Sequence, residues 1–450
     1  MELVMNKYKF SKYNHFKIYG NTTIGVNLHK KILFAIEKRK YTKLISYVSN
    51  TDQLALDDST LFSLMIKLGI IQEIDFDDSI RNQLLLENRV LNYGSKAYRL
   101  TINPTLNCNF NCWYCYEAHT KKVISKETMH SIINYVKNLV NRENIKLLYL
   151  DWFGGEPLLC YNSAMKFISY EAKKICDENN VELESAITTN GYLLRPEMIS
   201  FFKDVNMQSF QITLDGEKDI HDKIRYQSMK DSSYDKIVQN IILLTQQLEP
   251  QKLSLRINFT KESHAGISKI IDSFPPEIRS KITVLFQQIW QDKDNVNISV
   301  NEIEKIKTAF FKAGFKVERD ILNTKGYTCY ADMFKQAIIN YDGRVFKCTA
   351  RNFEKEKEDG YLTKEGEIHW NSILLSTKMS KSTFENDHCW NCKYLPICFG
   401  PCHQKFTIIN EDNTFDKFCY KGGIESTLDY IFLEFKNTKK PIAPLITFDY

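Results

Sequence analysis

The pattern of apolar positions is most regular between residues 98 and 325, where short apolar runs alternate with amphipathic stretches. The runs predict strands at 98–103, 147–153, 185–190, 209–214, 253–259 and 281–286. Between several of them, apolar residues recur at helical spacing, as in 129–140 and 234–248. Repeated strand–helix units with apolar strands predict an α/β fold with a parallel sheet covered by helices. Periodicity alone leaves open whether the sheet is doubly wound or forms an incomplete barrel.

Residues 1 to 95 have a different pattern and contain no cysteine. The pattern predicts strands at 13–20 and 22–26, helices at 28–48 and 59–70, and a short strand at 70–76. Gly20 and Asn21 are turn residues between the first two strands, and Ser59 is a candidate N-cap. Strands followed by helices in so short a segment favour a small winged-helix-like unit.

The composition is that of an ordinary globular protein, with 43% hydrophobic and 26% charged residues. The 60 basic and 55 acidic side chains leave a net charge of +5 and no concentrated basic stripe, so we do not expect nucleic acid as a partner. No apolar run approaches the roughly 20 residues that span a membrane, and the first ten residues lack the apolar core of a signal peptide. We therefore expect no membrane partner and a cytoplasmic protein.

The chain has 12 cysteines, which are kept reduced in the cytoplasm and are better explained as metal ligands than as disulfides. Ten of them fall into groups, while Cys160 and Cys176 stand apart and are expected to be buried apolar residues. Cys108, Cys112 and Cys115 form a C-x3-C-x2-C loop directly after the strand at 98–103. Three thiolates can hold three irons of a cubane and leave the fourth iron open.

This loop resembles the cysteine loop of the radical S-adenosylmethionine (radical SAM) enzymes. A zinc loop is the alternative, but zinc sites usually pair two C-x2-C motifs, and the next one begins only at Cys389. The resemblance implies a partial (β/α)6 barrel with chemistry at the carboxyl ends of the strands. It also implies that Tyr114 lies beside the adenine, and that the backbone of Gly154, Gly155 and Glu156 binds the methionine amino group. Glycine at these positions would let the backbone approach the ligand closely.

The segment QITLDGEKDIHDKIR, at 211–225, resembles the branch that contains anaerobic sulfatase maturases and peptide maturases. By that resemblance Thr213 and Arg225 contact S-adenosylmethionine, because an arginine fork suits its carboxylate. Asn190, which ends the third strand in TTNG, joins the expected cofactor contacts. Asp215 and Arg225 are the candidate catalytic residues, although Asp215 with Gly216 could also be only a turn. His221 and Asp222 are expected to be structural.

The end of the chain, from about 326, is rich in cysteine and resembles the SPASM domain, which carries auxiliary 4Fe–4S clusters. A zinc ribbon is the alternative. Residue by residue, the resemblance implies one cluster on Cys329, Cys348 and Cys402. It implies a second cluster on Cys389, Cys392, Cys398 and Cys419.

Two positions depart from the sulfatase maturases. They have an eighth cysteine shortly after the one that matches Cys329, whereas here 330–336 contain none. The first auxiliary cluster would therefore have an open iron or a non-cysteine ligand such as Asp332. Relatives of that branch also place an aspartate base after the cysteine that matches Cys348, where this chain has Thr349.

Together these observations predict a winged-helix-like leader-recognition domain at 1–95, a radical SAM partial barrel at 96–325 and a SPASM domain at 326–450. The function predicted is maturation of a ribosomally made precursor peptide. A 5′-deoxyadenosyl radical would take a hydrogen atom, and a thioether, C–C or C–O cross-link would form.

The expected cofactors are S-adenosylmethionine and three 4Fe–4S clusters, and the expected partners are a precursor peptide with its leader and a reductant such as flavodoxin or ferredoxin. The alternatives are an anaerobic sulfatase maturase, which forms formylglycine from Cys or Ser, and a non-catalytic electron-transfer protein. For residues 1–95 the alternative is a packing appendage, that is, a segment that only packs against the rest of the chain and binds no leader.

Overall fold

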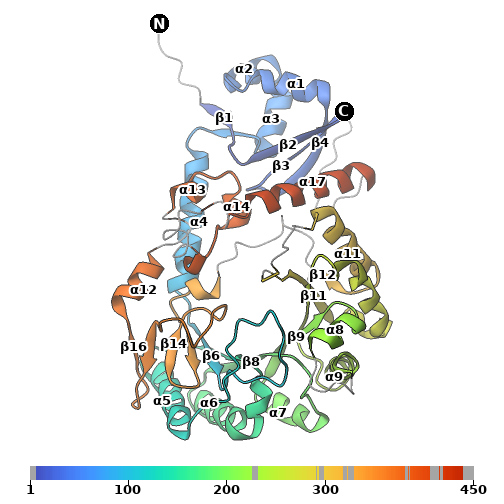
Figure 1. Cartoon of the computed structure of the whole chain (residues 1–450). Helices are drawn as coiled ribbons and strands as arrows, with labels where there is room; N and C mark the ends of the chain where they lie inside the picture. The colour runs from blue at the N-terminus through green and yellow to red at the C-terminus, as the bar shows by residue number, and fades with distance from the viewer. Residues whose placement is uncertain are drawn as a thin grey trace. The chain divides into compact units, whose positions relative to one another are not determined.

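The structure is a computed structural model that describes residues 7–225, 232–289, 291–292, 298–317, 322, 329–380, 384, 386–405, 415 and 419–438. The chain divides by contacts into two compact units (Figure 1). One consists of Met1–Gly94, Arg319–Asp332 and Lys378–Tyr450, and the other of Ser95–Glu318 and Met333–Thr377. We call them the terminal unit and the barrel unit.

The barrel unit contains one 11-stranded sheet in the order β12-β11-β10-β9-β8-β7-β6-β13-β14-β15-β16. Its parallel strands are β6 (Ala97–Asn103), β7 (Leu147–Trp152), β8 (Glu182–Thr189), β9 (Met207–Asp215), β10 (Lys252–Phe259) and β11 (Ile282–Gln288). All six predicted strands are confirmed. Because β12 and β16 are the two edges, the sheet is open, as an incomplete barrel requires.

The sheet continues beyond the predicted strands on both sides. β12 (Lys316–Val317) runs parallel to β11, and β13 (Gln336–Asn340) runs parallel to β6. β14 (Arg344–Phe346), β15 (Gly360–Leu362) and β16 (Ile368–Trp370) add an antiparallel meander. Residues 333–377 therefore pack with the barrel by contacts, which differs from the predicted boundary at 326. The pairing of β13 with β6 is the reason, and a strand pairing so distant in sequence leaves no local pattern.

The connections between the parallel strands are mostly helical. They are α5 (Lys126–Arg142), η1 (Pro157–Cys160), η2 (Tyr161–Met165), α6 (Lys166–Glu178), η3 (Pro196–Met198), α7 (Ile199–Asp204), α8 (Lys218–Ile224), α9 (Ser233–Gln247), η4 (His264–Ser273), α10 (Pro276–Arg279) and α11 (Val300–Lys312). The serine side chains of Ser125, Ser232 and Ser299 cap α5, α9 and α11 by accepting backbone N–H bonds. In Figure 1, α5, α6, α7 and α9 lie outside the curve of the strands.

One face of the sheet is polar. In the parallel register Thr101 lies beside Asp151, Thr213 beside Arg256, and Asp215 beside Asn258. Registered partners in a parallel sheet point to the same face, and alternate residues point to the other. The apolar residues at the alternate positions, such as Leu100 and Leu214, are fully buried. This polar face is unlike a packed core and is suited to a site.

The terminal unit begins with β1 (Tyr8–Phe10), which pairs with β5 (Ile71–Glu73). An antiparallel sheet follows, of order β2 (Asn14–Tyr19), β3 (Thr22–Asn27) and β4 (Ile32–Glu37), and then α1 (Lys38–Ser46), α2 (Thr51–Asp57), α3 (Ser59–Lys67) and α4 (Phe76–Tyr93). The predicted helix over 28–48 is wrong in its first half, since β4 occupies part of it. Phe34 and Ile36 pair there with Gly25 and Thr23 of β3, and this pairing outweighs the helical spacing.

The cysteine-rich segment contains η5 (Tyr330–Asp332), α12 (Ser372–Met379), α13 (Asp387–Trp390), α14 (Leu395–Cys398) and α17 (Lys421–Thr438). Within the terminal unit it shares one core with the N-terminal sheet. Ile24 and Val26 of β3 belong to the same buried cluster as Leu395 of α14 and Phe432 of α17. The first and last parts of the chain thus form one body.

Candidate functional site

The cysteine loop lies between β6 and α5, at the carboxyl end of the parallel strands. The backbone N–H of Cys115 donates to the carbonyl of Cys112 over 3.0 Å, which closes a tight turn. Burial raises the pKa of the Cys108 thiol to about 12 and that of Cys115 to about 11. Thiols with such values stay protonated at neutral pH unless a cation stabilises the thiolate. The loop therefore suits an iron cluster, which supplies that positive charge.

Gly154 and Gly155 bring the loop after β7 into direct contact with the cysteine loop. A Cβ on Gly154, whose φ is +112°, would lie 2.4 Å from the carbonyl oxygen of Thr105. A Cβ on Gly155 would lie 2.2 Å from the carbonyl oxygen of Asn107. Gly155 donates its N–H to Thr105 over 3.1 Å, and Glu156 donates to Asn107 over 2.8 Å. The glycines thus allow two backbones to touch just before the first cysteine.

Glu156 is fully buried, and protein groups use its carboxylate. It accepts the backbone N–H of Leu158 over 2.9 Å, the Thr189 hydroxyl over 2.8 Å and the backbone N–H of Asn190 over 2.8 Å. Burial raises its pKa to about 7. In this structure the Glu156 side chain joins the ends of β7 and β8, so only the backbone of this residue remains for contact with a ligand.

Asn190 reaches the cysteine loop from the end of β8. Its amide nitrogen donates to the Asn109 side-chain oxygen over 2.8 Å and lies 3.7 Å from the Cys108 sulfur. Its side-chain oxygen accepts the backbone N–H of Tyr192 over 2.9 Å. Asn190 therefore holds the first cysteine from the side of the third strand.

Tyr114, Asp215 and Arg225 meet, although Tyr114 lies more than a hundred residues from the other two in sequence. The Tyr114 hydroxyl donates to the Asp215 carboxylate over 2.6 Å and accepts from Arg225 Nη2 over 2.6 Å. Arg225 Nε donates to Asp215 over 2.7 Å. Burial alone would lower the pKa of Arg225, but the groups beside it, first the Asp215 carboxylate and then Tyr114, together outweigh burial and raise that pKa. Asp215 is 1% exposed, and the bonds of Tyr114 to this buried ion pair fix the cysteine loop to the end of β9.

Asn258 of β10 completes this network, because its amide donates to the Tyr114 hydroxyl over 3.0 Å. Thr213 lies two residues before Asp215 and therefore on the same face of β9. Arg225 uses Nε and Nη2 within the network, and its Nη1 has no partner among the described residues. A guanidinium offers five donors, so a ligand carboxylate could still bind there.

The neighbours of this network have structural contacts, as predicted. His221 is fully buried and accepts the backbone N–H of Asp215 over 3.0 Å, and burial lowers its pKa well below the usual value. The Asp222 carboxylate accepts the backbone N–H of Tyr234 over 2.9 Å at the start of α9. Gly216 has a φ of +69°, so the turn after Asp215 exists alongside its side-chain contacts.

Several polar residues of this face were missed by sequence reasoning. Arg99 and Asp151 form an ion pair, and both polar atoms of the fully buried Asn103 lack a partner in the described structure. Buried polar atoms without partners are costly, and a bound ligand or water would remove that cost. Asn103 ends β6 and Asn258 lies one residue before the end of β10, and this position near a strand end was the available signal for both.

Cys389, Cys392, Cys398 and Cys419 all line one hollow of about 370 Å³ in the terminal unit. Burial raises the pKa of Cys389 to about 12 and that of Cys398 to about 11. As in the cysteine loop, such thiols need a cation to become ligands. The grouping inferred from the sequence is thus also a grouping in space.

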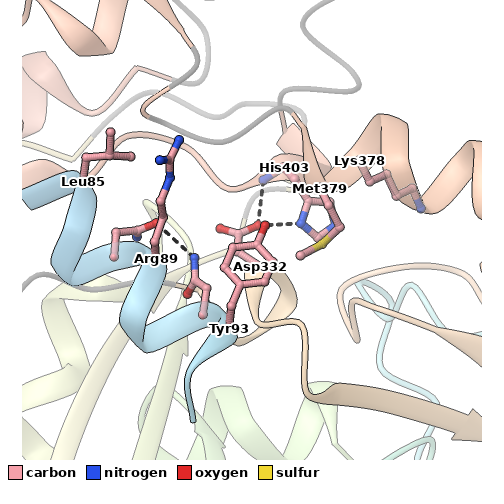
Figure 2. Close-up of a pocket in the computed structure, with 9 residues that line it drawn as sticks. Leu85, Arg89, Tyr93, Asp332, Lys378, Met379 and His403 are labelled. Carbon is pink, nitrogen blue, oxygen red and sulfur yellow. Dashed lines mark hydrogen bonds and ion pairs between the residues drawn. The ribbon is translucent and has the colours of Figure 1, made fainter. Parts of the chain in front are cut away.

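Cys329 and Cys402 share a hydrogen bond between their thiols, which raises the pKa of Cys329 and lowers that of Cys402. Beside them, the Asp332 carboxylate accepts both the backbone N–H and Nδ1 of His403, over 3.0 and 2.5 Å. Figure 2 shows this pair at a hollow of about 400 Å³ that α4 also lines. Cys348 is buried in the barrel unit, so its place in this group stays a prediction.

Cys160 and Cys176 are 1% and 0% exposed, as expected for apolar residues. In the described part of the chain, no three His, Cys, Asp or Glu side chains are arranged as ligands of one metal ion. The iron assignments therefore rest on thiol chemistry and on the placement of the loops. Among the described helices, none combines the length and apolarity needed to cross a bilayer.

Comparison with known proteins decides the family. Residues 102–273 match the model of the radical SAM superfamily. An uncharacterized protein of Methanocaldococcus jannaschii is 32% identical over 263 residues, which cover 55% of this chain and 84% of that protein. The chain belongs to the radical SAM superfamily.

Other relatives of this radical SAM enzyme are named for their reactions. The cysteine-type anaerobic sulfatase-maturating enzyme of Clostridium novyi is 25% identical over 344 residues, covering 69% of this chain and 88% of the relative. The radical SAM cyclopropyl synthase TigE of Paramaledivibacter caminithermalis is 23% identical over 347 residues, covering 68% and 67%. The solved structure of anSMEcpe with bound AdoMet and a peptide shares the fold, with a TM-score of 0.53 and 17% identity over 75% of this chain and 98% of that one.

Membership of the superfamily implies S-adenosylmethionine and a 4Fe–4S cluster. The cysteine-rich end of this radical SAM enzyme is compatible with auxiliary clusters. The polar strand ends, the cysteine loop and the glycine loop all lie at the carboxyl ends of the parallel strands.

Proposed function

We propose that the chain is a radical SAM peptide maturase with a SPASM-like end, which modifies a ribosomally made precursor peptide. The observation that carries the proposal is the set of contacts around the cysteine loop. Asn190 holds Cys108, Gly155 touches the backbone before it, and Tyr114 joins the ion pair of Asp215 and Arg225. These groups come from the ends of β7, β8 and β9 and support one site.

Cys108, Cys112 and Cys115 would hold the catalytic cluster. When bound, the cluster and S-adenosylmethionine supply a 5′-deoxyadenosyl radical that can take hydrogen from an unactivated carbon. The backbone of Gly154 and Gly155 would bind the cofactor's amino group, and Arg225 would bind its carboxylate. Asp215 then acts through Arg225 and Tyr114 as a positioning residue.

A peptide substrate is supported by the relatives and by the terminal unit. The relatives are named for the maturation of sulfatases and for cyclopropyl synthesis. In the described terminal unit, β2 and β4 each pair on one side only, so each offers an edge for strand addition. The sheet shares its core with the segment of Cys389 to Cys398, so a leader bound at an edge would lie on the same body as that cysteine hollow. We infer that residues 1–95 recognise the leader.

The auxiliary sites would hold two further clusters, one on Cys389, Cys392, Cys398 and Cys419 and one on Cys329, Cys348 and Cys402. The set of Cys329, Cys348 and Cys402 has three thiolates only. Asp332 could close the fourth position, but one of its oxygens already accepts two bonds from His403. We infer that this iron can take an exogenous ligand, and that a thiolate of the substrate would suit it. That arrangement would favour a thioether product.

The second candidate is an anaerobic sulfatase maturase. The relative from Clostridium novyi and the fold of anSMEcpe favour it. Thr349, which stands where that branch has an aspartate base, speaks against it.

The test is an anaerobic reaction with S-adenosylmethionine, a reductant such as flavodoxin or ferredoxin, and either a precursor peptide encoded beside the enzyme or a sulfatase-derived peptide. We expect 5′-deoxyadenosine and a precursor that has lost two hydrogens. The variant with Cys108, Cys112 and Cys115 all changed to Ala should keep its auxiliary iron and form no 5′-deoxyadenosine. Formylglycine in the sulfatase peptide would favour the second candidate, and iron without any 5′-deoxyadenosine would favour an electron-transfer protein.

A further inference from the structure

His119 contacts a cysteine of the catalytic loop. Its Nε2 lies 3.1 Å from the sulfur of Cys115, four residues earlier in the chain. The side chain is half-buried. Of the side-chain contacts to the three loop sulfurs within the described residues, this one is the shortest, since Asn190 lies 3.7 Å from Cys108 and Asn109 lies 4.0 Å from it.

The chemistry of the two groups decides which one donates. A cysteine that binds iron is a thiolate and can only accept a hydrogen bond. A neutral imidazole carries one N–H, so Nε2 must hold the proton when the cluster is present.

The backbone is bent to make this contact. His119 has a φ of +50°, in the left-handed region that L residues seldom adopt. Such a conformation is strained and persists where surrounding contacts hold it. Here the bend returns the imidazole to the sulfur, so the strain is associated with one specific interaction.

We propose that His119 is a positioning residue that raises the reduction potential of the cluster on Cys108, Cys112 and Cys115 by donating Nε2–H to the Cys115 sulfur. The proposal rests on the cluster assignment made under the proposed function. One electron from the reductant makes the cluster more negative, and a donor to its sulfur stabilises the more negative state. His119 would thus ease the reduction that must precede every turnover.

The experiment compares His119→Phe, which keeps a planar ring without a donor, with His119→Gln, whose amide nitrogen can take the place of Nε2. His130→Phe is the matched control, because His130 is exposed on α5 and bonds the carbonyl of Lys126. Redox titrations followed by electron paramagnetic resonance would give the midpoint potential of the cluster signal that responds to S-adenosylmethionine. We expect a more negative potential for His119→Phe, recovery in His119→Gln and no shift in His130→Phe, all at equal iron content. An unshifted potential in His119→Phe with its cluster intact would overturn the proposal.

A measurement on the unmodified enzyme covers the case in which His119→Phe loses its cluster. With ¹⁵N-labelled histidine, pulsed electron paramagnetic resonance of the same signal should show a weak coupling to one imidazole nitrogen. No coupling, or a coupling as large as that of a direct iron ligand, would overturn the role of His119. If the unmodified enzyme has no cluster signal that responds to S-adenosylmethionine, the cluster assignment itself fails, and the two failures can be told apart.

Discussion

Gly155→Ala tests the contact between the glycine loop and the cysteine loop without changing any other residue of the site. Its Cβ would lie 2.2 Å from the carbonyl oxygen of Asn107 and 2.5 Å from that of Leu106. Carbon–oxygen contacts are comfortable at about 3.3 Å, so the loops must separate by about 1.1 Å. Unlike Gly154, this glycine does not have a φ in the left-handed region, so the substitution tests the clash alone.

The expected cost follows from the bonds that this shift breaks. The N–H of Gly155 bonds Thr105 and that of Glu156 bonds Asn107, at 3.1 and 2.8 Å. Two lost hydrogen bonds at about 1 kcal/mol each, with about 1–3 kcal/mol of overpacking, give a destabilisation of about 3–5 kcal/mol. A displacement of about 1 Å beside the reacting groups can lower a rate by about a hundredfold. We expect weaker binding of S-adenosylmethionine and about a hundredfold less 5′-deoxyadenosine.

The assay measures cofactor affinity by calorimetry and the initial rate of 5′-deoxyadenosine release, both under anaerobic conditions. Gly343→Ala is the matched control in the same unit, because its φ is +81° and its Cβ would meet nothing closer than 3.9 Å. That control should lose about 1–2 kcal/mol of stability to backbone strain and keep its cleavage rate. A folded Gly155→Ala enzyme whose affinity and rate stay within twofold of the unmodified enzyme would refute the reasoning.

Three further outcomes are expected. Burial raises the pKa of Glu156 from 4.5 to about 7, so the folded protein should lose stability as pH rises between these values, by about 3 kcal/mol at about 1.36 kcal/mol per pH unit. The thermal midpoint of Glu156→Gln should not fall over this pH range. Parallel profiles of thermal midpoint against pH for the two proteins would contradict the prediction. Asn258→Ala removes one of the bonds to the Tyr114 hydroxyl, and we expect about 1 kcal/mol less stability and a modest rise in the dissociation constant of S-adenosylmethionine, measured by calorimetry. Because residues 1–94 share a core with the cysteine-rich segment, leader recognition is better tested by Ile18→Glu on the edge strand β2, where the side chain is 48% exposed. We expect weaker binding of the precursor in fluorescence titrations while S-adenosylmethionine is still cleaved without peptide, and unchanged kinetics on full-length precursor would favour a packing appendage.

Much of the barrel could be predicted from the sequence, because buried parallel strands are apolar and lie in separate runs. The start of α3 was predicted within one residue, although the capping side chain is Asp58 and not Ser59. The prediction failed at β4, where the spacing of apolar residues fits a helix and the pairing with β3 decides otherwise. It also missed β13, although the apolar runs on either side of Asp342 and Gly343 are a hairpin signal; only the pairing of β13 with β6, across more than two hundred residues, leaves no local pattern.

The sequence by itself determined the chemistry available to this protein, through a cysteine loop with an open position, a pair of glycines and a second group of clustered cysteines. These features are local, since the spacing of ligands within one loop limits what they can bind. Only the tertiary structure decided which distant residues complete the site. The bonds of Tyr114 to Asp215, Arg225 and Asn258 arise because parallel strands end at one edge of the sheet, whatever their separation in sequence. The contact of His119 with Cys115 depends on a backbone bend that the residue types in the loop do not predict.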